Sequence, residues 1–162
     1  MLSFQDLYET YARDVYRFAL WITGDRCEAE DIASETILRA WVRRHKIRTE
    51  TLKAYLFTIA RNIYLGKLRK RARQLDLDED IADPAPGPER VIESDLELQR
   101  VRAILQTIPE IDRAAFVMRV QHELPYAEIA RALELSLTAT KVKVYRVRKK
   151  LLSRLLDEEV AE

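Results

Sequence analysis

The sequence has little glycine, proline or cysteine, and each shortage excludes a class of structure. Only 3 glycines and 5 prolines occur among 162 residues, too few for the many turns of an all-β domain. Cys27 is the single cysteine, which excludes an intramolecular disulfide and a cysteine-based zinc site. The two histidines, His45 and His122, lie far apart in the sequence and are expected on the surface. We therefore predict no bound metal and no cofactor.

Long apolar segments and enzyme motifs are missing as well. No run of 18 apolar residues occurs, and the N-terminal residues lack a basic segment followed by an apolar one, so we expect a cytoplasmic protein without membrane insertion or signal peptide. There is no glycine-rich phosphate loop, paired-histidine metal spacing or nucleophile elbow. Asp31 and Glu35 share a helix face, but a solvated or partner-binding acidic face explains them better than a catalytic pair. We predict that the protein is not an enzyme.

Charge is distributed unevenly along the chain, although the formal net charge is only +1. Residues 1–75 carry a net charge of +6, residues 76–100 carry −7 and residues 101–162 carry +2. Charged residues make up 34% of the sequence and hydrophobic residues 48%, which is typical of amphipathic helices around an apolar core. The pattern predicts an all-α fold of two small helical domains joined by a flexible, acidic, proline-rich linker.

The first domain is predicted over residues 1–73. Helical periodicity indicates helices at about 4–22, 28–44 and 52–73, with a basic loop over 45–51. Ser3 is a suitable N-cap for the first helix, with Asp6 three residues later. Six basic residues and no acid occur from Arg61 to Arg73. The linker is predicted over residues 74–93, where Pro84, Pro86 and Pro88 forbid a helix and the acids repel each other.

The second domain is predicted over residues 94–156, with helices at about 95–107, 110–121, 125–133 and 138–155. Leu96 and Val120 are assigned to its core, and the acidic tail DEEVAE is expected to fray. The last two helices, joined by Glu134, Leu135 and Ser136, read as a helix-turn-helix, although such turns usually have glycine where Glu134 stands. Ser136 or Thr138 can cap the second helix of this pair.

The final helix of this helix-turn-helix has an apolar face and a basic one. Thr140, Val144, Val147, Leu151 and Leu155 recur at helical spacing, and no acid occurs from Ala139 to Leu152. A basic second helix of this motif is typical of a helix that enters the DNA major groove. A merely solvated basic face is the alternative at this point.

Three stretches resemble a known family. AEDIASETILRAW (Ala29–Trp41) resembles the second conserved region of bacterial sigma factors, and KAYLFTIARNIYLGKLRKR (Lys53–Arg71) looks like the following segment of the extracytoplasmic-function (ECF) group. Residues 107–151 resemble the fourth region of that group. The resemblance covers about residues 4–73 and 96–155 and implies a subunit that binds core RNA polymerase and directs it to promoter DNA.

The resemblance also implies roles for individual residues. Asp31 and Glu35 would dock on polymerase, and the loop 45–51 with the third helix would recognise and open the −10 element. A single strand and an extruded base need a basic groove with stacking surfaces. The residues implied at the −10 element and in melting are Tyr55, Ile59, Arg61, Asn62, Lys67, Arg69 and Arg71. Those implied at the −35 element are Lys141, Val142, Lys143, Tyr145, Arg146 and Arg148.

Two other functions remain open from the residues. One is a stand-alone helix-turn-helix regulator that binds DNA without polymerase, and the other is a sigma mimic that binds a regulator. The acidic second helix disfavours the first, and the seven basic residues from Lys141 to Arg154 disfavour the second. The family resemblance also implies an anti-sigma factor as a partner.

Overall fold

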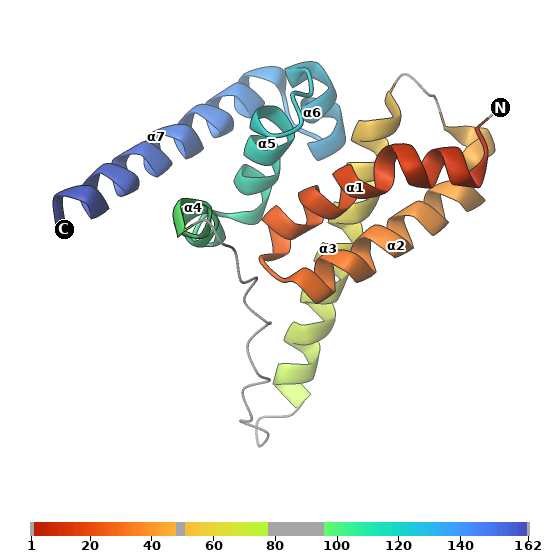
Figure 1. The fold of residues 1–162 in the computed structure, drawn as a ribbon, viewed down its shortest axis with the longest axis horizontal. Helices are drawn as coiled ribbons and strands as arrows, with labels where there is room; N and C mark the ends of the chain where they lie inside the picture. Colours follow the sequence, from red (N-terminus) through yellow and green to blue (C-terminus); the bar gives the residue numbers. More distant parts are fainter. Residues whose placement is uncertain (1, 48–50, 78–95, 162) are drawn as a thin grey trace.

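The computed structural model describes residues 2–47, 51–77 and 96–161. Every regular element within these ranges is helical (Figure 1). The elements are α1 (Phe4–Thr23), α2 (Arg26–Val42), the short 3₁₀ helix η1 (Arg44–Lys46), α3 (Leu52–Leu77), α4 (Leu96–Gln106), α5 (Glu110–Val120), α6 (Tyr126–Leu133) and α7 (Leu137–Ala161). The prediction of an all-α fold is confirmed.

Helices α1 to α3 form the first unit, in which α1 and α2 lie side by side and α3 crosses them (Figure 1). The Ser3 hydroxyl accepts a hydrogen bond from the backbone N–H of Asp6, and the Asp6 carboxylate accepts one from the backbone N–H of Ser3, so the predicted N-cap is a complete capping box. Gly24 ends α1 at φ 70°, a conformation that glycine adopts without strain, and Asp25 then caps α2. These local signals place the bend between α1 and α2.

Helices α4 to α7 form the second unit, with α5 and α4 packed on the long helix α7 (Figure 1). Its core includes Ile104, Leu105, Met118, Ile129 and Val144, all buried. The assignment of Leu96 and Val120 to this core was wrong, because they are 69% and 44% exposed. Leu96 opens α4 and Val120 ends α5, so each lies at a helix end where packing on neighbouring helices stops.

Two helices run further than the sequence indicated. Helix α3 continues to Leu77, so residues 74–77 of the predicted linker are helical, and residues 78–93 lie outside the described part of the chain. Helix α7 continues to Ala161, so residues 156–161, which were predicted to lie beyond the last helix, are helical. Neither extension contains glycine or proline, and both are rich in residues that favour helices. No helix among the described residues is long and apolar enough to cross a membrane.

The two units pack against each other and share one hydrophobic core. The His122 ring, just after α5, lies 4.5 Å from the Phe57 ring of α3 and 6.2 Å from the Phe18 ring of α1, measured between centroids. Phe18 and Phe57 are themselves stacked at 4.4 Å. The expectation that His122 lies on the surface was therefore wrong: it is only 7% exposed, because the end of α5 inserts into the first unit.

Burial lowers the pKa of His122 from 6.5 to about 4, with a smaller lowering from Lys53 and Arg17 and an opposing effect of Asp14. The unfolded chain therefore takes up a proton below pH 6.5, whereas the folded chain does not until about pH 4. We expect the contribution of His122 to the free energy of unfolding to be constant above pH 6.5. Between pH 6.5 and 4 this contribution should fall by at most about 1.4 kcal/mol per pH unit. Urea unfolding at pH 7, 6 and 5 measures this, and His122→Phe should flatten the dependence. An unchanged dependence in the variant would show that another group titrates.

Arg113 is a second buried polar group between the units. Its guanidinium Nη1 donates to the carbonyl oxygens of Leu105 and Ile108 at 3.2 and 3.1 Å, and Nη2 donates to the Tyr64 hydroxyl of α3 at 3.3 Å. The Leu105 carbonyl also accepts the backbone N–H of Ile108 at 3.1 Å, whereas the Ile108 carbonyl, beyond the end of α4, receives its hydrogen bond from Arg113. Desolvation raises the pKa of Tyr64, against the lowering effect of the Arg113 charge.

We expect Arg113→Met to lower the free energy of unfolding by about 1–3 kcal/mol, because it removes the side-chain donor of the Ile108 carbonyl and the hydrogen bond to the buried Tyr64 hydroxyl. Denaturant unfolding would measure the loss. Arg154→Met is the matched control, since Arg154 is exposed on α7, and it should change stability by less than about 0.5 kcal/mol. Equal effects of the two variants would show that the Arg113 hydrogen bonds contribute nothing.

Candidate nucleic-acid interface

The turn between α6 and α7 has helix-turn-helix geometry. Glu134 adopts φ 55° and ψ 46°, the left-handed conformation that glycine usually supplies, at a cost of roughly 1 kcal/mol for a residue with a side chain. The N–H of Leu135 donates to the carbonyl of Ala130 at 2.9 Å, which closes the end of α6. Of the two predicted caps, the Ser136 hydroxyl is the one used, and it accepts from the N–H of Ala139 at 3.1 Å. Glutamate at the turn therefore does not prevent the motif.

Helix α7 separates an inward face from an outward face as the sequence indicated. Thr140, Val144, Val147 and Leu151 are buried. The predicted DNA-contacting residues on the exposed face are Lys141, Val142, Tyr145, Arg146 and Arg148. Because Tyr145 is 64% and Val142 38% exposed, this face offers stacking and apolar contacts between the cations.

Lys143 is placed differently from the other predicted residues of α7. It is half-buried, and its ammonium Nζ lies 2.7 Å from Oδ1 of Asp112 on α5. Lys141 by contrast is exposed, with Nζ 5.8 Å from the centre of the Tyr126 ring. In this arrangement Lys143 already has an anionic partner, whereas the ammonium of Lys141 is accessible.

Helix α3 carries the other basic surface, and its cations differ in accessibility. Arg69 is exposed and Lys67 half-buried, while Arg71 pairs with Oε2 of the buried Glu28 at 3.0 Å. Arg61 is paired with Glu110 of α5: its Nε donates to Oε1 at 2.5 Å and its Nη2 donates to Oε2 at 2.9 Å. Arg61 and Arg71 therefore have acidic partners within the described chain, whereas Arg69 is accessible.

The three uncharged residues implied in strand contact do not share one surface. Asn62 is exposed, Ile59 is 7% exposed, and Tyr55 is half-buried. Tyr55 lines a crevice of about 200 Å³ whose other wall is formed by Glu128 and Arg131 of α6. In this arrangement Asn62 is therefore the accessible member of the three.

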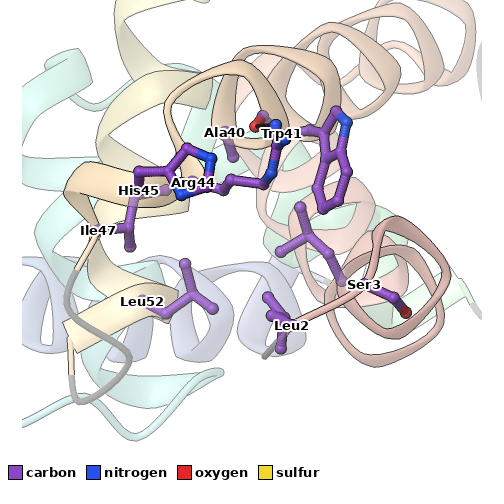
Figure 2. A pocket seen from close by; sticks show the side chains of 9 residues that line it. Leu2, Ser3, Ala40, Trp41, Arg44, His45, Ile47 and Leu52 are labelled. Atoms are coloured by element: carbon purple, nitrogen blue, oxygen red, sulfur yellow. Dashed lines mark hydrogen bonds between the residues drawn. The ribbon is translucent and has the colours of Figure 1, made fainter.

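A larger pocket, of about 380 Å³, lies where the loop after α2 meets the N-terminal end of α1 (Figure 2). The residues around it are Leu2, Ser3, Leu7, Ala40, Trp41, Arg44, His45, Ile47 and Leu52. The Arg44 guanidinium stacks on the Trp41 ring, 4.0 Å from its centre, and donates to the Trp41 carbonyl at 2.9 Å. Apolar walls beside a fixed cation can receive a flat aromatic group. Residues 48–50 of the predicted recognition loop lie outside the described part of the chain.

The acidic face of α2 is the remaining predicted site. Asp31 is exposed, and no hydrogen bond or ion pair links it to another described residue. Glu35 is half-exposed and accepts a 2.6 Å hydrogen bond from Arg39 of the same helix. Asp31 is therefore the freer of the two charges to meet a basic partner.

Sequence reasoning missed Glu110 and Asp112, the acids that hold Arg61 and Lys143. They lie 49 and 31 residues from these partners, so no local pattern connects the pairs. Both acids occur in the first turn of α5, where acidic residues are common because they complement the helix dipole.

Two helical units, the second a helix-turn-helix with an outward basic helix, define the class of multi-domain helix-turn-helix proteins. Residues 7–74 match the family model of sigma-70 region 2, and residues 98–151 match that of sigma-70 region 4. The chain is 32% identical over 150 residues to the ECF RNA polymerase sigma factor EcfG of Rhodopseudomonas palustris, covering 90% of this chain and 80% of that protein. It therefore belongs to the family of ECF RNA polymerase sigma factors.

A second curated protein and one solved structure are also similar to this chain. The chain is 27% identical over 154 residues to the ECF sigma factor SigM of Bacillus subtilis, covering 93% of each protein. Its fold is similar to that of the sigma factor RpoE from Bartonella quintana, solved in complex with the anti-sigma factor NepR, with a TM-score of 0.81 and 24% identity. That match covers 94% of this chain and 96% of RpoE, so the fold of both units is shared.

Proposed function

We propose that this protein binds core RNA polymerase in the cytoplasm, recognises the −10 and −35 promoter elements and promotes melting of the DNA to start transcription. The observation that carries the proposal is the outward face of α7, where Lys141, Tyr145 and Arg146 are exposed on the second helix of a helix-turn-helix. In such motifs the second helix enters the major groove, and arginine reads guanine while neighbouring cations hold phosphates. We assign this face to the −35 element.

The other surfaces have complementary roles in this proposal. Asp31 and Glu35 of α2 would contact basic residues of the polymerase, and the exposed Asn62 and Arg69 of α3 would contact the −10 element. A basic helix with stacking groups suits a single strand, because stacking is tolerant of sequence and cations follow the backbone. RpoE was crystallised with the anti-sigma factor NepR, and we propose a protein of that class as a regulator of this chain.

The test is reconstitution with core RNA polymerase, followed by run-off transcription from a promoter library. Polymerase binding and promoter-specific transcripts are expected. DNA binding without polymerase binding would instead indicate a stand-alone regulator. If neither is bound, but a regulator protein is, the chain is a sigma mimic.

A further inference from the structure

Two acidic side chains in the first turn of α5 each hold a cation for which the family resemblance implies a DNA contact. Glu110 accepts two parallel hydrogen bonds from Arg61 of α3, at 2.5 and 2.9 Å, and Asp112 accepts one from Lys143 of α7 at 2.7 Å. A bidentate arginine–carboxylate pair has the same fork geometry as an arginine–phosphate pair. One turn of α5 therefore presents anions to both candidate DNA-binding helices.

Both ion pairs are shielded from solvent. The Arg61 and Glu110 side chains are 15% and 18% exposed, and those of Lys143 and Asp112 are 25% and 20% exposed. Partly buried pairs are screened by salt much less than surface pairs. A phosphate oxygen cannot occupy the positions of the Glu110 carboxylate oxygens, so Arg61 can grip DNA through this fork only after Glu110 has left.

The Arg61–Glu110 pair joins the two helical units, and other contacts close the same interface. Gln106 of α4 donates through Nε2 to the carbonyls of Trp21 and Ile22 at the end of α1, at 3.3 Å each. Helix α6 forms the wall opposite Tyr55, so the closed arrangement also limits access to that part of α3. These contacts hold Glu110 beside Arg61 as long as the two units stay packed together.

We propose that the first turn of α5 is an intramolecular competitor of DNA, in which Glu110 and Asp112 take the places of phosphates at Arg61 and Lys143, and the Glu110 contact with Arg61 helps to keep the two units closed. DNA binding through Arg61 and the closed arrangement then exclude each other. The sequence has 18 residues between Leu77 and Leu96, and 18 fully extended residues span up to about 60 Å, so the covalent connection permits separation. The assignment of Arg61 and Lys143 to DNA rests on the function proposed above.

The first experiment measures closure without DNA or polymerase. A fluorophore pair on the exposed Cys27 of α2 and on a cysteine introduced by Ser153→Cys in α7 reports the distance between the units. In the double variant Glu110→Gln/Asp112→Asn, we expect a larger population at long distance than in the parent. The matched control is Glu158→Gln/Glu159→Gln, which removes the same charge at exposed positions of α7 and should leave the distances unchanged.

The second experiment measures affinity by fluorescence anisotropy on duplex and single-stranded DNA. We expect the α5 double variant to bind at least about five-fold more tightly than the control variant, and DNA to shift the labelled parent protein to longer distances. Unchanged distances in the α5 double variant would overturn the proposal. The proposal would also be overturned if this variant opened but bound DNA no more tightly than the control variant. Neither readout uses polymerase, so the two claims can fail separately. If α5 competed with DNA but the protein did not direct transcription, the proposed function would be rejected and the competition would stand.

Discussion

Replacing Arg146 by alanine is expected to weaken binding to the −35 element by about 5- to 150-fold, since a good base contact by arginine is worth about 1–3 kcal/mol. Arg146 is exposed on the outward face of α7 and is surrounded by further cations that can retain non-specific binding. Affinity for promoter DNA should therefore decrease, whereas affinity for unrelated DNA should change much less. Titration of holoenzyme with promoter and scrambled duplexes at one salt concentration measures both.

Arg148→Ala is the control for this prediction. Arg148 is exposed two residues further along α7, and we expect it to contact phosphate. Its removal should weaken both duplexes equally and reduce the salt dependence of binding by about one counterion. If Arg146→Ala also affected both duplexes equally, Arg146 would be a phosphate contact and its assignment to base recognition would be wrong.

Reversing the charge at Asp31 is expected to weaken binding to core RNA polymerase by about ten-fold or more. Asp31 is exposed on α2 and unpaired among the described residues, so its whole charge is available to a basic partner. Asp31→Lys replaces that attraction by repulsion, and like charges facing each other across an interface cost several kcal/mol. Competition for core polymerase against a labelled sigma factor measures the change, without any need for promoter DNA.

Two variants test whether this effect is local. Glu159→Lys makes the same change in net charge at the exposed end of α7 and should leave polymerase affinity nearly unchanged. Glu35→Lys should weaken binding less than Asp31→Lys does, because Glu35 already shares its charge with Arg39 at 2.6 Å. An Asp31→Lys protein that competes as well as the parent would remove Asp31 from the docking surface.

Much of the local structure was predictable because it depends on neighbours in the sequence. The capping box at Ser3, the break at Gly24 and the inward face of α7 involve residues at most a few turns apart. The turn at Glu134 shows where this reasoning weakens. Sequence preference argued against a residue with a side chain at positive φ, but the packing of α6 and α7 repays a local cost of roughly 1 kcal/mol.

The sequence by itself determined the all-helical class, the basic outward helix and the acidic face of α2, since each follows from the period and charge of one segment. Only the tertiary structure decided how the two units meet: His122 packs on Phe57, and Arg61 pairs with Glu110. Such contacts join residues dozens of positions apart and depend on the docking of whole helices, which no local periodicity encodes. The same docking determines which of the predicted DNA contacts are open and which are already occupied.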